Sequence, residues 1–190
     1  MRQPDGTIRK LRRSVDEPGH AHELTFSCYR SLPLLSNDST RLWLLDALRQ
    51  ARSKLDLELW AYVIMPEHVH ILLLPCADTY RTSSILQAIK QPVSRRALHW
   101  LRRQRDPQLR SLRHVRRNGH VGYHFWQPGG GYDRNITSPR VAWQAVDYIH
   151  NNPVRRGLVD GAVDWPWSSA RWYAGCDDVQ LAMDGGPPDP

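Results

Sequence analysis

Residues 65–75 read MPEHVHILLLP and place two histidines one residue apart at the start of an apolar run. Successive side chains of a β-strand point to opposite faces of a sheet. His68 and His70 would therefore share one face, and the apolar side chains that alternate with them would pack on the other. Two imidazoles on one face of a rigid strand can supply half of a metal site. The spacing alone is a weak signal, because residues 20–22 (His-Ala-His) repeat it and we assign them no role.

The hydrophobic pattern on both sides of this stretch predicts further regular elements. Residues 22–29 and 55–64 carry β-favouring side chains and are expected to form strands. Residues 55–74 would then be a hairpin whose turn is residues 65–67. Residues 37–52 begin with Asn-Asp-Ser, a helix N-cap signal, and their leucines recur at helical spacing.

The second half of the chain continues this alternation. Residues 83–103 are expected to be helical, with Pro92 causing a kink or a new start. A basic connector would follow at 104–122, and a short fourth strand at 123–127. Ser138 and Pro139 mark the start of a helix that runs to about Asn151. This order predicts an α+β fold of the ferredoxin-like sandwich type, an antiparallel sheet of four or five strands with helices on one face.

A chain of 190 residues fits one domain, which we expect to span residues 21–174. Residues 1–20 would be a basic flexible arm and residues 175–190 a disordered tail. Three widely spaced cysteines fit neither a disulfide framework nor a zinc knuckle. The basic start lacks the apolar core of a secretory signal, and no run approaches the ~18 apolar residues of a membrane span. We therefore expect a soluble protein of the cytoplasm.

The charge pattern favours a nucleic-acid partner. The formal net charge is +7, and nine arginines fall within residues 95–117, where Asp106 is the only acid. Guanidinium groups bind phosphate in bidentate fashion and stack on bases. The alternative is that these arginines form a solvated helix face. From this run we predict DNA contacts by four residues: Arg95, Arg96, Arg102 and Arg103.

The predicted helix after Ser138 carries further candidate side chains. Its apolar residues fall on one arc that would face the sheet. Gln144, Tyr148 and Asn152 follow at four-residue intervals along the border of that arc, so they lie above one another. Tyr148 and Asn152 could both face the histidine pair. A single tyrosine at such a position is more often a packing residue, so the spacing alone leaves its role open.

Five motifs occur together in this chain. They are PEHVH at 66–70, WQ at 126–127, YDR at 132–134, DYIHNNPV at 147–154 with GLV at 157–159, and DWPWSS at 164–169. In this order and spacing the chain resembles the REP-associated tyrosine transposases, which are IS200-like enzymes of the HUH single-strand transposase superfamily. The resemblance covers about residues 20–173. One departure is the glycine run at 129–131, where bulkier and often basic residues are expected.

The resemblance implies a site and a reaction. His68, His70 and the amide oxygen of Asn152 would bind a divalent metal, Mg²⁺ or Mn²⁺, which polarises the scissile phosphate. Tyr148 would attack phosphorus in line, leaving a 5′-phosphotyrosine and a free 3′-OH, so that the strand can be rejoined without ATP. Tyr132, which follows the glycine run, is the second candidate for the nucleophile. No further cofactor is expected.

The resemblance thus predicts a metal-dependent single-strand DNA endonuclease and strand transferase that binds hairpin-forming repeat DNA. Arg134, Arg155 and Arg156 would contact phosphates, although a solvated role is equally open. Glu67 is expected to point to the opposite sheet face and His150 to solvent. The protein would be nucleoid-associated and act as a monomer or a homodimer.

Three alternatives stay open at this point. A relaxase-like replication initiator would use the same chemistry. A domesticated hairpin-binding protein would have lost catalysis. A metal hydrolase would use water as its nucleophile and would keep its activity without Tyr148.

Overall fold

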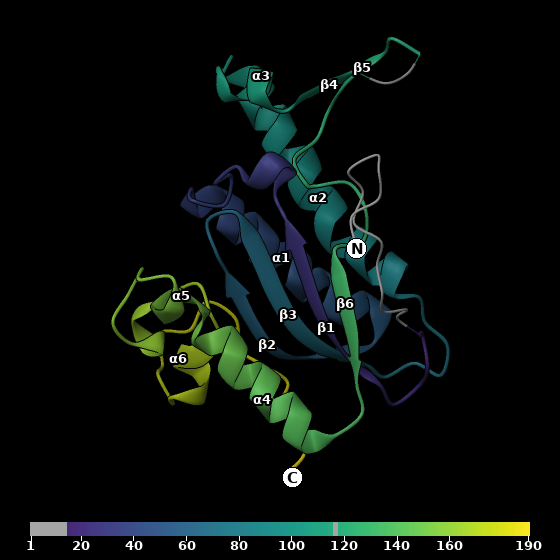
Figure 1. Cartoon of the computed structure of the whole chain (residues 1–190), viewed down its shortest axis with the longest axis vertical. Coiled ribbons are helices and arrows are strands. Elements are labelled where there is room, and N and C mark those ends of the chain that lie inside the picture. The colour runs from purple at the N-terminus through teal and green to yellow at the C-terminus, as the bar shows by residue number, and fades with distance from the viewer. Residues whose placement is uncertain (1–14, 116–117) are drawn as a thin grey trace, which may run out of the picture.

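The computed structural model describes residues 15–115 and 118–190, and the described residues form one main antiparallel sheet of four strands. The strand order is β2-β3-β1-β6, so the histidine strand is central and β2 and β6 lie at the edges (Figure 1). The four strands are β1 (Ala21–Ser27), β2 (Leu57–Ile64), β3 (His68–Pro75) and β6 (Tyr132–Ile136). The predicted hairpin of β2 and β3 is present, with its turn at residues 65–67.

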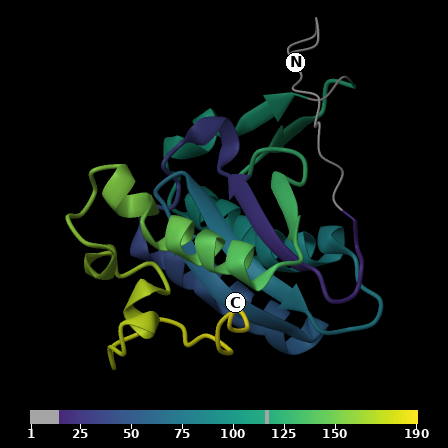
Figure 2. The ribbon, with the colours of Figure 1, turned by 60° about the horizontal axis from the view of Figure 1, so that its bottom comes forward.

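Helices cover both faces of this sheet, so the prediction of helices on one face is wrong. Helices α1 (Asp38–Leu55) and α2 (Thr82–Arg103) pack on one face, and α4 (Pro139–His150) packs on the other (Figure 1, Figure 2). The physical reason lies in the two central strands, β1 and β3, whose side chains are buried on both faces. Burial of both faces requires a covering layer on each side. Helix α2 does not restart at Pro92, which lies inside it.

The histidine strand alternates as the sequence predicts. Val69, Ile71 and Leu73 belong to the core cluster that includes α1 and α2. Leu72 belongs to the cluster under α4, so His70 lies on the α4 face. The apolar arc of α4 faces the sheet, with Ala142, Ala145, Val146 and Ile149 buried.

Residues 104–127 differ from the prediction. The segment contains α3 (Gln108–Ser111) and a separate two-stranded hairpin of β4 (Arg113–Val115) and β5 (Val121–Tyr123). Residues 123–127 pair with the main sheet only through one isolated bridge, between Trp126 and Cys28, so the fourth strand of that sheet is β6. The prediction failed because strand pairing depends on partners distant in sequence.

A loop at the edge of the sheet separates Trp126 from β6. Trp126 lies opposite Cys28, and Tyr132 lies opposite Thr25. An interval of three residues, from 25 to 28, is therefore paired with an interval of six residues, from 126 to 132. The surplus residues leave the sheet as a loop containing the glycine run. A Cβ on Gly131 would lie 2.1 Å from the carbonyl oxygen of Thr25, and its φ is +75°. Only glycine fits this close approach.

The C-terminal part winds beside α4 and then returns to β2. Its short elements are α5 (Asn152–Arg155), η2 (Ala162–Asp164) and α6 (Ala170–Tyr173), and another short helix, η1 (Tyr29–Ser31), follows β1. Leu181 and Met183 are buried in the core, and a carboxylate oxygen of Asp184 accepts a hydrogen bond from the backbone of Leu59. The expected disordered tail at 175–190 is therefore not what the structure shows. These contacts give the β2 edge apolar and hydrogen-bonding partners.

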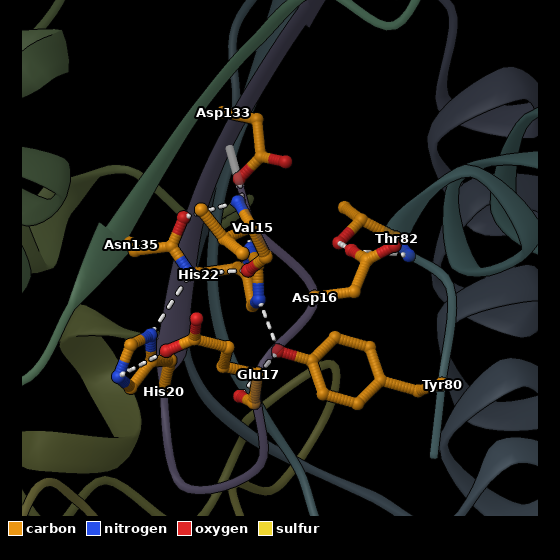
Figure 3. Close-up of polar contacts among 9 residues, drawn as sticks. All are labelled: Val15, Asp16, Glu17, His20, His22, Tyr80, Thr82, Asp133 and Asn135. Atoms are coloured by element: carbon orange, nitrogen blue, oxygen red, sulfur yellow. Dashed lines mark hydrogen bonds and ion pairs between the residues drawn. The ribbon is translucent and has the colours of Figure 1, made fainter. Parts of the chain in front are cut away.

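The first described residues are attached to the opposite edge of the sheet (Figure 3). Val15 and Asn135 exchange two hydrogen bonds, of 3.0 and 2.6 Å. His22 is fully buried, with Nδ1 2.8 Å from Asp133 and Nε2 2.7 Å from the hydroxyl of Tyr80. This part of the predicted flexible arm is held in place, whereas residues 1–14 lie outside the described residues. Within the described ranges, no helix is long and apolar enough to cross a membrane.

Candidate active site

Three side chains meet on the α4 face of the sheet. His68 and His70 project from the start of β3, and their Nε2 atoms are 3.1 Å apart. Asn152 is the first residue of α5, directly after α4 ends, and its amide lies 3.2 Å from Nε2 of His70. The structure therefore brings together the three residues that the sequence assigned to a metal.

The Nδ1 atoms of both imidazoles have hydrogen-bonding partners. The hydroxyl of Thr25, on the neighbouring strand β1, lies 2.8 Å from Nδ1 of His70. A carboxylate oxygen of Glu67 lies 3.2 Å from Nδ1 of His68. Such partners set the tautomer and orientation of a ligating imidazole. The expectation that Glu67 points away is wrong, because Glu67 lies in the turn, where strand alternation does not apply.

Burial keeps the two imidazoles neutral. Burial, together with the nearby His68, lowers the pKa of His70 to about 4. Burial also lowers the pKa of His68, although the carboxylate of Glu67 opposes this shift. Burial raises the pKa of Glu67, but His68 and Arg156 outweigh it, so this carboxyl is held below its usual range. At neutral pH the site presents two neutral imidazoles, the form that binds metals.

This arrangement fits a divalent cation. An ionised Glu67 can only accept, so Nδ1 of His68 carries the proton and its Nε2 has a free lone pair. If Nδ1 of His70 likewise donates to Thr25, both Nε2 lone pairs face the same space at 3.1 Å. A cation between them would relieve this repulsion, and Asn152 could turn its amide oxygen toward it. Among the described residues no three His, Cys, Asp or Glu side chains form a metal cluster, so an amide is the third protein ligand available.

Tyr148 lies beside this group. Its ring is edge-to-face with His70, at 5.6 Å between centroids, and the guanidinium of Arg155 lies 4.9 Å from its centroid. Tyr148 is 41% exposed and lines an open pocket of about 470 Å³. Tyr132, the alternative nucleophile, is 43% exposed and lines the same pocket at the start of β6. The pocket is therefore open to a substrate and has His70 and both tyrosines in its walls.

The match to known families covers this site. Residues 19–152, from just before β1 to Asn152, match the family described as "Transposase IS200 like". This chain belongs to the IS200-like transposase family. No curated protein matches it.

The fold of the chain is similar to that of one solved structure in particular. It resembles a REP-associated tyrosine transposase solved bound to a REP hairpin, with a TM-score of 0.61 and 24% identity over 93% of both chains. A putative transposase from Deinococcus radiodurans is 23% identical, over 76% of this chain and 97% of that chain, with a TM-score of 0.45.

Three of the predicted DNA-binding arginines lie at the site of this IS200-like transposase. Arg134 lines the pocket and pairs at 2.7 Å with the buried carboxylate of Glu23. Arg155 lies over Tyr148, and Arg156 pairs with Glu67 at 2.8 Å. Arg134 thus lines the pocket itself, and Arg155 and Arg156 lie next to Tyr148 and Glu67.

The other four arginines lie on α2, across the sheet from the transposase site. Arg96 pairs with Asp46 at 2.7 Å, Arg102 lies 5.3 Å from the ring centroid of Tyr123, and Arg103 ends the helix. Arg95 lines a separate groove. The structure therefore does not bring these arginines into the pocket.

Sequence reasoning missed one residue of the candidate site, gave a second no role, and misplaced a histidine outside the site. Thr25 was missed because only the strand register places it opposite His70. Glu67 was named but given no role, although its position next to His68 was a usable signal. His150 was expected in solvent but is buried, and its Nε2 lies 2.8 Å from the hydroxyl of Ser169. The segment around Ser169 packs against the end of α4, which no local pattern predicts.

Proposed function

We propose that this transposase cleaves and rejoins single strands of DNA at hairpin-forming repeats, through a 5′-phosphotyrosine on Tyr148. The observation that carries the proposal is the edge-to-face contact of Tyr148 with His70, next to the converging His68 and Asn152. A nucleophile and a phosphate-binding group must both reach the same scissile phosphate.

The divalent metal, Mg²⁺ or Mn²⁺, would be held by His68, His70 and Asn152 and would neutralise charge that develops on the phosphate. Tyr148 forms the new bond, from its phenolic oxygen to phosphorus. The bond from phosphorus to the 3′ oxygen breaks, the phenol gives up its proton, and the leaving 3′ oxygen takes up one proton to become the free 3′-OH. The phosphotyrosine keeps the energy of the phosphodiester, so a second 3′-OH can reverse the reaction and join a new strand.

The surrounding charges would orient the substrate. Arg155 lies over the ring of Tyr148 and places positive charge beside the phenol that would meet the phosphate. Arg134 pairs with Glu23 through one terminal nitrogen, and its Nε is buried, so only its remaining terminal nitrogen could donate to a phosphate oxygen. Tyr132 would line the path of the strand beside the reacting phosphate.

The choice of hairpin repeats rests on family and fold. A REP hairpin is bound in the solved relative that shares the fold along nearly all of the chain. Unpaired bases beside a folded stem are available for contacts that a continuous duplex does not offer. A basic protein of net charge +7 would bind the phosphates of such a substrate.

The test uses labelled hairpin oligonucleotides drawn from repeats that flank the gene. We would incubate them with the wild type, Tyr148→Phe and Tyr132→Phe, with and without Mn²⁺, and separate the products on a denaturing protein gel. The proposal predicts a covalent band that needs metal, disappears in Tyr148→Phe and persists in Tyr132→Phe. Cleavage without an adduct would instead indicate a water nucleophile, and tight binding without cleavage a catalytically silent hairpin-binding protein.

A further inference from the structure

A second cavity lies between α2 and residues 123–130, on the face of the sheet opposite Tyr148. It is a groove of about 450 Å³, within the range of sites that hold small organic groups. Neither the family match nor the proposed chemistry assigns a role to it. Its walls come from the outer side of α2 and from the loop that leads into β6.

The fold holds this groove open with specific contacts. The indole nitrogen of Trp126 donates to the carbonyl oxygen of Lys90 at 2.8 Å. The ammonium group of Lys90 donates to the carbonyl oxygen of Gly129 at 3.0 Å. Both ends of the loop are therefore attached to the same turn of α2. The loop contains more residues than the segment of β1 opposite it. It therefore projects from the sheet and forms one wall of the groove.

The lining has the chemistry of a site for unpaired nucleotides. Gln87 and Gln91 are exposed and lie one turn apart on α2, so their amides face the groove together. Amide side chains can donate and accept at base edges. Tyr123 and His124 add aromatic surface on which bases stack. Arg95 and Lys90 add positive charge, and no carboxylate occurs among the described residues that line the groove.

The groove is continuous with the active site along the chain. Gly129 and Gly130 line the groove, and Tyr132 lines the pocket of Tyr148. Two residues of chain span at most about 7 Å, so only the edge of the sheet separates the two cavities. The glycines have no side chains that would block a strand crossing this edge. A DNA strand leaving the pocket past Tyr132 therefore reaches the groove within a few nucleotides.

We propose that the groove between α2 and residues 123–130 binds the unpaired DNA next to the cleaved phosphate. Gln87 and Gln91 bond to base edges, Tyr123 and His124 stack on bases, and Arg95 contacts the backbone. The groove would then select which strand segment enters the active site. This inference rests on the proposed function, because it requires that the substrate is single-stranded at the site.

The test measures the affinity of the full-length protein for two fluorescent oligonucleotides. Both contain the same hairpin, and one also has the short unpaired flank. In the wild type we expect the flanked oligonucleotide to bind more tightly. The double variant Gln87→Ala/Gln91→Ala should lose about tenfold in affinity for the flanked oligonucleotide and keep its affinity for the bare hairpin. Gln50→Ala, an exposed glutamine on α1, is the matched control and should change neither.

Each other outcome has a definite meaning. Equal losses for both oligonucleotides, or none in the double variant, would overturn the assignment of the groove. A wild type that binds both oligonucleotides equally would overturn it as well. A wild type that binds neither, and forms no covalent adduct, would instead contradict the proposed function. Both glutamines are exposed, so thermal melting should show that the variants fold normally.

Discussion

Glu67 and Arg156 form an ion pair of 2.8 Å across the candidate active site, and the same carboxylate oxygen lies 3.2 Å from Nδ1 of His68. Glu67 belongs to the turn before β3, and Arg156 directly follows α5, whose first residue is Asn152. The ion pair thus connects the segment that carries the histidines to the one that carries the amide. We regard Glu67 as a residue that positions the metal ligands.

Glu67→Gln should weaken metal binding about 10- to 100-fold, the usual effect of losing the outer partner of a ligating histidine. The neutral amide holds Arg156 less strongly and no longer requires the proton of His68 to be on Nδ1. Calorimetric titration of the DNA-free protein with Mn²⁺ measures the affinity. Asp78→Asn, at an exposed carboxylate away from the site, is the control. Equal affinities of Glu67→Gln and wild type would show that the contact has no positioning role.

Thr25→Val should weaken metal binding in the same assay, because the valine keeps the shape of the side chain and removes the partner of Nδ1 of His70. Thr25→Ser restores the hydroxyl and should restore most of the affinity. Nitrogen NMR of the imidazoles gives a second measurement, since it reports which ring nitrogen carries the proton. A wild-type tautomer distribution in Thr25→Val would argue against this role for the hydroxyl.

Gly131→Ala should destabilise the protein more than Gly129→Ala. Both residues have positive φ, which costs a non-glycine residue about 1–2 kcal/mol. At Gly131 the new methyl group would also collide with the carbonyl oxygen of Thr25, whereas nothing lies within 4 Å at Gly129. Urea unfolding of the two variants measures the difference. Equal losses of stability would mean that β1 and the loop can separate without cost.

The stability of the DNA-free protein should fall as the pH is lowered from about 6.5 toward 4. Burial lowers the pKa of His150 from its usual 6.5 to about 4, so the unfolded chain takes up this proton at a higher pH than the folded one. A group of this kind destabilises the fold by about 1.4 kcal/mol per pH unit within that window, and its effect is absent above it. His150→Gln should reduce the slope of unfolding free energy against pH. An unchanged slope would contradict the assignment to His150.

The local parts of this account could be predicted from the sequence. The alternation in β3 placed His68 and His70 on one face, and the helical spacing placed Tyr148 on the border of the apolar arc of α4. Both follow from the geometry of a single element. The chemistry expected of these residues came from the resemblance to the REP-associated tyrosine transposases.

The remaining parts depend on contacts between distant segments. The register that sets Thr25 against His70, and the loop created by the unequal spacing opposite β1, require knowledge of which strands pair. The helix on the second face of the sheet follows from burial of both faces. The continuous apolar run of β3 indicated such burial, but the predicted fold placed helices on one face only. The C-terminal segment docks at the β2 edge through two apolar side chains, Leu181 and Met183, in an otherwise polar tail.

The most direct test of the central proposal is to identify the residue that carries DNA after the reaction. Wild-type protein would be incubated with Mn²⁺ and a hairpin oligonucleotide, digested with nuclease and trypsin, and analysed by mass spectrometry. Trypsin separates Tyr148, in the peptide of residues 141–155, from Tyr132, in the peptide of residues 118–134. The account predicts a nucleotide on the peptide 141–155, located at Tyr148. A nucleotide on residues 118–134, or cleaved DNA without any modified peptide, would contradict it.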